Sequence, residues 1–150
     1  MYYMILIHSV MRWLILIALI WAVFTGWEGR AFKRAFRLSD RIAVSAVSVL
    51  SQIQLLLGFW LYMDSPVVKG FWADRSFHWN DSLFFALVHI GLMTTAIVLI
   101  TIGSALAKKA TEDRRKFNTV FTYYGIALLI VLLAIPWPFS PLAQRPFLRF

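Results

Sequence analysis

Four long apolar stretches, separated by short segments that hold most of the charged residues, constrain this chain more than any other feature. They run approximately from Tyr2 to Phe24, Ile42 to Met63, Leu83 to Leu106 and Asn118 to Ile135. About 20 predominantly apolar residues in a helix span the hydrocarbon core of a bilayer, which is roughly 30 Å thick. With 61% hydrophobic residues and a mean hydropathy of +0.73, the chain is too apolar for a soluble domain of 150 residues. We therefore predict an all-α integral membrane four-helix bundle that forms a single domain over residues 1–150 and contacts the lipid bilayer.

The ends of the stretches carry ordinary helix signals. Capping residues precede the second and third stretches, and prolines follow the fourth: Ser39 and Asp40, Asn80 to Ser82, and Pro136 and Pro138. No basic region precedes the first stretch and no small-residue cleavage site follows it. We therefore expect a permanent helix there rather than a cleaved signal peptide.

The basic residues are unevenly distributed between the two sides that these helices define. Ten lie in the first and third connections: Arg30, Lys33, Arg34, Arg37, Arg41, Lys108, Lys109, Arg114, Arg115 and Lys116. Four lie on the opposite side: Lys69, Arg75, Arg145 and Arg149. Since cytoplasmic loops carry an excess of Lys and Arg, we expect the first and third connections in the cytoplasm and both termini outside. The net charge of +8 is then explained by the basic residues of the cytoplasmic connections and does not indicate nucleic-acid binding.

The connection from Asp64 to Ser82, "DSPVVKGFWADRSFHWNDS", is long for a simple loop. Its aromatic residues predict an outer segment that lies on the membrane surface, and a long loop of this kind can cover a site. We expect His78 within it to be interfacial, with a role as a ligand or proton-transfer group less favoured. Further aromatic residues cluster at the predicted boundaries: Trp60, Tyr62, Trp72, Trp79 and Trp137 outside, and Trp21 and Trp27 inside.

Three ionisable residues lie inside the predicted spans: His8 and Arg12 in the first, and His89 in the third. A charged Arg at the centre of a membrane helix costs roughly 2.5 to 3.5 kcal/mol on insertion scales. We therefore expect these residues to make contacts that offset this cost. His8 lies six residues after Tyr2, and His89 lies six residues after Leu83. Because the first and third helices run parallel, both histidines lie about 9 Å below the outer boundary.

Two neutral imidazoles that face each other across a bundle can hold the iron of a haem b without any cysteine. His8 and His89 are therefore candidate metal ligands for a non-covalent, bis-His haem b. Met93 shares the helix face of His89 and is a candidate cofactor contact. An alternative stays open, since a histidine in a membrane helix also serves simply to hydrogen-bond another helix.

Arg12 shares a helix face with His8, because the two residues are four apart. On that face it is a candidate partner for a haem propionate or a quinone carbonyl. Gln54, on a polar face of the second helix with Ser51 and Gly58, lies at nearly the depth of Arg12. A hydrogen bond between Arg12 and Gln54 is an equally good explanation of both residues.

The chain has no cysteine, which excludes disulfides, iron–sulfur clusters, thiolate metal sites and covalent haem attachment within it. Its sequence also lacks a buried carboxylate pair, a nucleophile with an oriented base and a phosphate-binding glycine loop. These absences favour an electron carrier or a subunit over a complete enzyme.

Several stretches carry a resemblance to a known family: "HSVMRW", "QLLLGFWLYM", "HIGLMTTAIVLITIGSALAKKA" and "YGIALLIVLLAIPW". They resemble short four-helix bacterial membrane proteins that are called cytochrome b or cytochrome b-like, over nearly the whole chain. The resemblance matches His8 and His89 to the histidines of the first and third helices. The long diheme cytochrome b carries paired histidines on two helices, so this chain is limited to one haem.

Two hypotheses about function follow. In the first, the protein binds one haem b near the outer face and exchanges electrons with quinone or with larger membrane redox subunits. In the second, it is a haem-free structural or accessory subunit, and the C-terminal "SPLAQRPFLRF" docks to a neighbour in a homo- or hetero-oligomer. A transporter is less favoured, because the spans lack paired Gly/Pro-interrupted helices.

Overall fold

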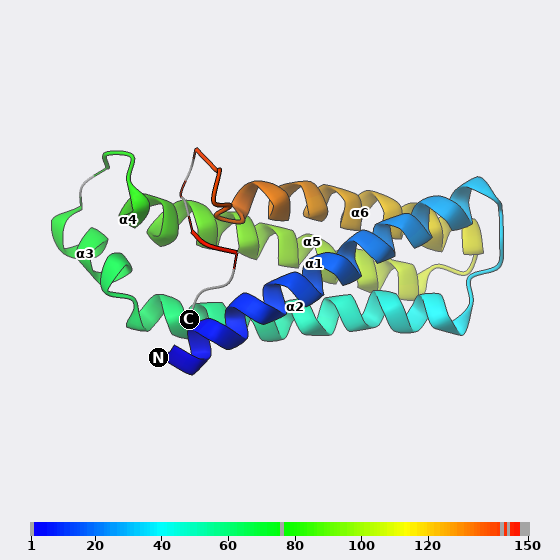
Figure 1. The fold of residues 1–150 in the computed structure, drawn as a ribbon. Coiled ribbons are helices and arrows are strands. Elements are labelled where there is room, and N and C mark those ends of the chain that lie inside the picture. Colours follow the sequence, from blue (N-terminus) through cyan, green and yellow to red (C-terminus); the bar gives the residue numbers. More distant parts are fainter. Residues whose placement is uncertain (1, 76, 142, 144, 148–150) are drawn as a thin grey trace.

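Four long helical segments make up most of the computed structural model, which describes residues 2–75, 77–141, 143 and 145–147. They are α1 (Tyr2–Ala31), α2 (Leu38–Asp64), a continuous segment over Asp81–Lys109, and α6 (Asp113–Ala134). Successive segments run antiparallel, so that α1 and the third segment are parallel (Figure 1). The described residues form helices and no strand, which confirms the all-α prediction. All four segments are long and apolar enough to cross a membrane, as expected of a multi-pass membrane protein.

The third segment changes its helical geometry along its length. It consists of α4 (Asp81–Leu83), the π-helix η1 (Phe84–His89) and α5 (Ile90–Lys109). Asn80 caps its start, because the Asn80 Oδ1 atom accepts a hydrogen bond of 2.9 Å from the Leu83 backbone nitrogen. This confirms the predicted helix start. A π-helical turn is rare and often marks a functional site, and here it ends at His89.

The start of α2 differs from the prediction. The helix begins at Leu38, so Asp40 lies in its first turn instead of preceding it. Its carboxylate accepts a hydrogen bond of 2.8 Å from the backbone nitrogen of Arg37 and pairs with Arg34 at 2.7 Å. The hydrogen bonds that Arg34 donates to Asp40 and, more weakly, to Glu28 raise the pKa of Arg34 above its usual value. These contacts fix the connection between α1 and α2.

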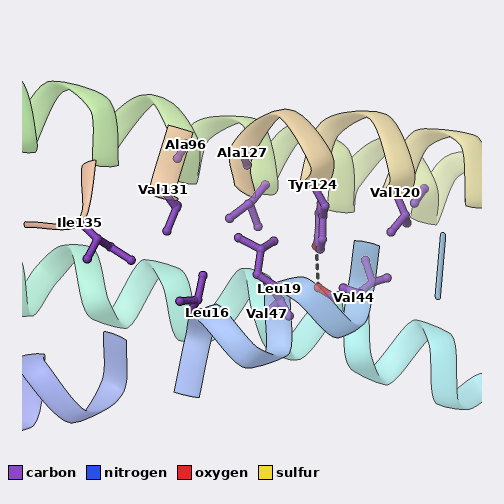
Figure 2. Close-up of a cluster of buried hydrophobic side chains, with 13 residues drawn as sticks. Leu16, Leu19, Val44, Val47, Ala96, Val120, Tyr124, Ala127, Val131 and Ile135 are labelled. Atoms are coloured by element: carbon purple, nitrogen blue, oxygen red, sulfur yellow. Dashed lines mark hydrogen bonds between the residues drawn. The ribbon is translucent and has the colours of Figure 1, made fainter. Parts of the chain in front are cut away.

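The helices pack as a ring in the order α1, α2, α5 and α6. Both α1 and α5 pack against α2 and α6, so they occupy opposite corners of the bundle. A buried hydrophobic cluster runs along the inside of the bundle, from Val120 near the start of α6 to Ile135 just after its end (Figure 2). Its largest member, Tyr124, is fully buried and donates a hydrogen bond of 2.7 Å to the carbonyl oxygen of Val44. The core therefore extends through most of the bundle, and the end opposite the α1–α2 connection carries a further helix.

That other end is covered by α3 (Pro66–Asp74), within the long connection between α2 and α4 (Figure 1). We refer to it as the α3 end. Ser65 caps α3 by accepting a hydrogen bond from the Val68 nitrogen, and proline at the first position suits a helix start. Val68 and Phe71 are buried against Ala86 of η1. The predicted outer segment is thus an ordered helix packed on the end of the bundle.

The aromatic residues assigned to membrane boundaries divide into two groups. Five are exposed: Trp21, Trp27, Trp60, Trp72 and Trp79. Tyr62 instead lies partly buried, donating to the Ala86 carbonyl oxygen at 3.1 Å and accepting from the Trp72 indole nitrogen at 2.9 Å. Trp137 is half-buried with its ring against Trp13, so these two residues have internal packing roles.

Candidate functional site

A cavity of about 380 Å³ lies between α1, α2 and the third segment at the α3 end. This volume falls within the range of roughly 300 to 1,000 Å³ typical of ligand pockets. All five residues that the sequence singled out line it: His8, Arg12, Gln54, His89 and Met93. Residues 65–68, which lead into α3, also line it, so the outer connection does cover this site. The structure brings the predicted residues to one place, and its walls are largely apolar.

His89 is oriented by a hydrogen bond to the end of α6. Its Nδ1 atom lies 2.8 Å from the carbonyl oxygen of Ala134. A carbonyl only accepts, so Nδ1 carries the proton and Nε2 is left as the unprotonated nitrogen. Histidines that bind metals are commonly held in this way, with the distal nitrogen fixed by a carbonyl. His89 is therefore arranged as a metal ligand would be.

The sequence around Pro136 and Pro138 explains why that carbonyl is available. In an α-helix the carbonyl of residue i accepts from the N–H of residue i+4, and proline has no N–H. The carbonyls of Leu132 and Ala134 therefore have no backbone donor in the next turn. Side chains replace the missing donors: the Trp137 indole donates to Leu132 at 2.8 Å, and His89 donates to Ala134.

The rings of Phe84 and Phe85 support His89 on the side of η1. Both ring centroids lie 5.8 Å from the imidazole centroid. Phe84 is fully buried, whereas Phe85 lines the cavity. The two phenyl rings also contact each other, with centroids 5.1 Å apart, so the imidazole of His89 packs against a pair of aromatic rings.

His8 approaches from the opposite corner of the bundle and lies against α2. A Cβ atom at Gly58 would be only 3.3 Å from the His8 Cε1 atom, so glycine makes room for the ring. The Gln54 Nε2 atom donates a hydrogen bond of 2.9 Å to the backbone carbonyl of His8. The bond between Arg12 and Gln54 that the sequence offered as an explanation is not formed: the Gln54 Oε1 atom, which would accept it, has no partner among the described residues, and Arg12 Nη2 donates to the carbonyl oxygen of Phe147 instead.

Arg12 instead holds the C-terminal segment, by which we mean the described residues after α6, 135–141, 143 and 145–147. Its Nη2 atom donates to the backbone carbonyl of Phe147, and the Trp13 indole donates to the same oxygen at 2.9 Å. The guanidinium also lies 5.1 Å from the centre of the Trp13 ring. The C-terminal segment is in this way fastened to α1 (Figure 1). Arg149, counted in the charge analysis, lies outside the described residues.

Several polar atoms of the cavity wall are buried without a hydrogen-bond partner in the described part of the chain. They are His8 Nδ1, Arg12 Nε, Ser51 Oγ and Gln54 Oε1. A buried polar atom without a partner costs about 1 to 3 kcal/mol. Four such atoms around one cavity indicate that it is built to hold a ligand or water molecules that complete these bonds.

Sequence reasoning missed Arg145 as a site residue. It lines the cavity, pairs with Asp81 at 2.7 Å and lies 5.0 Å from the centre of the Phe85 ring. Over the described lining, the charged residues are Arg12 and Arg145, both cationic. The prolines end α6 before Arg145, so the spacing of residues along a helix cannot predict where this side chain points. The sequence therefore offered no signal for its position.

Two further observations bear on the sequence predictions. His78 is exposed and does not line the cavity. The residues that the structure describes contain no group of three or more His, Cys, Asp or Glu side chains able to hold a metal ion. A haem iron needs only two protein ligands, since the porphyrin supplies the remaining nitrogens.

Comparison with protein-family models, with curated proteins and with solved structures finds no match to this chain.

Proposed function

We propose that the protein is a membrane electron-transfer protein that binds one haem b between His8 and His89. One observation carries the proposal: these two histidines project from opposite corners of the bundle into the same cavity. Two histidines from facing helices are a common arrangement for a non-covalent haem. The resemblance to cytochrome b-like proteins agrees with it.

The residues present fit this cofactor. His89 already has the tautomer of a ligand, fixed by Ala134. The Nδ1 atom of His8 is buried without a hydrogen-bond partner among the described residues. This is expected of an imidazole whose partner is a ligand held in the cavity. The rest of the wall suits a flat apolar ring, with Met93 beside His89 and aliphatic residues deeper in the bundle, Ile97, Ile100 and Val131.

The bound haem would supply one-electron transfer at the iron. The chain's own residues would do the rest: His8 and His89 would hold the iron, Gly58 leaves room for the His8 ring, and the Ala134 carbonyl orients the imidazole of His89. The aliphatic wall excludes water, and exclusion of water is one of the factors that set the potential of a haem. Gln54 adds a polar group to the cavity wall.

The membrane orientation is part of the proposal. The two connections rich in Lys and Arg lie at the end opposite α3, which the positive-inside rule assigns to the cytoplasm of a bacterial inner membrane. Both termini and the cavity then lie on the outer side, with α3 along the membrane surface. Electrons reach the haem from a quinone or from another membrane redox subunit, because the sequence has no nicotinamide- or flavin-binding motif.

The second hypothesis, a haem-free accessory subunit, included docking of the C-terminal residues to a neighbour. The described ones instead contact the protein's own α1 and η1, through Phe147 and Arg145. That feature therefore gives this hypothesis no support, and the cavity favours the first.

A reduced-minus-oxidised optical spectrum of the protein in mild detergent tests the proposal, with haem measured per chain. We expect a low-spin b-type spectrum near one haem per chain. His8→Ala and His89→Ala should each remove it while the protein still inserts, and the exposed His78→Ala serves as the matched control. A colourless protein from haem-replete cells, or full haem retention in both variants, would overturn the proposal.

A further inference from the structure

Arg145 lies at the mouth of the cavity, on the C-terminal segment. We propose that Arg145 binds a carboxylate of the apolar ligand held in the cavity, which on the proposed function is a propionate of haem b. The inference rests on the proposed function for the identity of the ligand. Its basis is a set of contacts that the haem hypothesis did not use.

The first contact joins Arg145 to the histidine site. Its guanidinium lies 5.0 Å from the centre of the Phe85 ring, and that ring lies 5.8 Å from the imidazole of His89. Arg145 and His89, a proposed iron ligand, therefore contact the same aromatic ring. The side chain of Arg145 retains 24% of its surface exposed, so it borders both the cavity and the outside. This is where the charged edge of a mostly apolar ligand would lie.

The second contact shows that Arg145 can bind a carboxylate in this position. Its Nη2 atom lies 2.7 Å from the Oδ2 atom of Asp81, which is 48% exposed. An exposed ion pair contributes little net stability, so Asp81 is a weak competitor for the guanidinium. A ligand that buries its apolar body in the cavity brings its own carboxylate to the same place, and arginine matches a carboxylate with two parallel hydrogen bonds.

The charge of the cavity wall favours an anionic ligand. The two charged residues of the described lining, Arg12 and Arg145, are both cationic, and largely apolar groups surround them. Charges attract more strongly in such surroundings than in water. The described lining contains no carboxylate, since Asp81, the partner of Arg145, lies outside it and is 48% exposed. A ligand carboxylate would therefore balance the charge of the wall better than a neutral ligand.

Arg12 is less suited than Arg145 to meet the carboxylate. It lies one helical turn, about 6 Å, deeper than His8, and its Nη2 atom donates to the Phe147 carbonyl. That bond, with the one from Trp13, fastens the segment that carries Arg145. We therefore assign Arg12 as a positioning residue and Arg145 as the residue that touches the ligand.

Metal-free protoporphyrin IX and its dimethyl ester provide the test, because they differ only in their carboxylates and need no iron ligand. Binding of each to the full chain in detergent is followed by porphyrin fluorescence. We expect the wild type to bind the diacid about tenfold more tightly than the ester, as a charge-assisted contact predicts. Arg145→Gln should lose this preference, and Arg145→Lys should keep part of it. Lys69→Gln, an equal charge change away from the cavity, should keep all of it.

Asp81→Asn separates ligand binding from a merely structural ion pair. If Asp81 competes with the ligand, its loss raises the affinity for the diacid severalfold and leaves that for the ester unchanged. If the pair is structural, Asp81→Asn and Arg145→Gln lower the affinity for the diacid alike, which overturns the inference. Equal binding of diacid and ester by the wild type also overturns it, with no variant required.

The outcomes distinguish this inference from the proposed function. A tenfold preference for the diacid in a protein that shows no bis-His haem spectrum would reject iron ligation and retain the carboxylate site. A bis-His spectrum with equal binding of the two porphyrins would support iron ligation and reject the carboxylate site. A wild type that binds neither porphyrin overturns the inference and counts against haem binding as well.

Discussion

The imidazole of His89 donates a hydrogen bond of 2.8 Å to the carbonyl oxygen of Ala134, at the end of α6. The bond joins the π-helical turn η1 to the helix packed beside the third segment. It exists because Pro138 has no N–H to offer that carbonyl. One contact therefore both closes the end of α6 and fixes the proton on the imidazole.

Replacing His89 by leucine should destabilise the protein by about 1 to 3 kcal/mol, because the Ala134 carbonyl loses a donor that the backbone cannot replace. Unfolding in detergent, followed by circular dichroism with no haem added, measures this effect. His78→Leu is the matched control, since His78 is exposed. Equal stability of the two variants would contradict the role of the bond.

Adding a side chain at Gly58 should displace His8. A Cβ atom there lies 3.3 Å from the ring, so alanine requires a shift of a few tenths of an ångström and valine requires more. On the proposed function, Gly58→Val lowers haem content more than Gly58→Ala does, as measured by the optical spectrum. Gly91→Val is the control, because a Cβ at Gly91 meets nothing within 4 Å. Equal loss in both valine variants would mean that helix packing in general is responsible.

Removing the guanidinium of Arg12 should loosen the C-terminal segment. Arg12→Leu leaves the Phe147 carbonyl with the Trp13 donor alone. We expect chymotrypsin to cleave the end of the chain several times faster in the variant than in the wild type. Arg75→Leu is the control, since Arg75 is exposed and does not line the cavity. Unchanged cleavage would show that the segment is held by its other contacts.

The pairing at the start of α2 should contribute to stability. Asp40→Asn removes the ion pair with Arg34 and weakens the cap on the Arg37 nitrogen, with an expected cost of about 1 to 2 kcal/mol. Arg34 is charged at neutral pH, and because its pKa is raised, its share of the stability is lost on the alkaline side only at strongly alkaline pH. On the acid side the pair is lost when the Asp40 carboxylate is protonated. Thermal unfolding measures the cost, with the exposed Asp74→Asn as control. A loss of stability no larger than that of the control would contradict a stabilising role for the Asp40–Arg34 pair.

The apolar stretches of the sequence predicted the four long helices, because twenty or more apolar residues between charged segments permit little else. Counting residues also placed His8 and His89 at one depth, and the structure brings both to one cavity. The rise of a helix is regular, so depth along a parallel pair can be read from the chain.

The tertiary structure alone decided what surrounds those histidines. The rotation of each helix about its axis, the π-helical turn before His89 and the path of the chain after Pro136 all depend on packing between distant residues. For that reason the sequence did not predict the bond from His89 to Ala134, nor the position of Arg145. Composition and spacing determine which segments are helices, whereas the contacts that orient a side chain arise only when those helices meet.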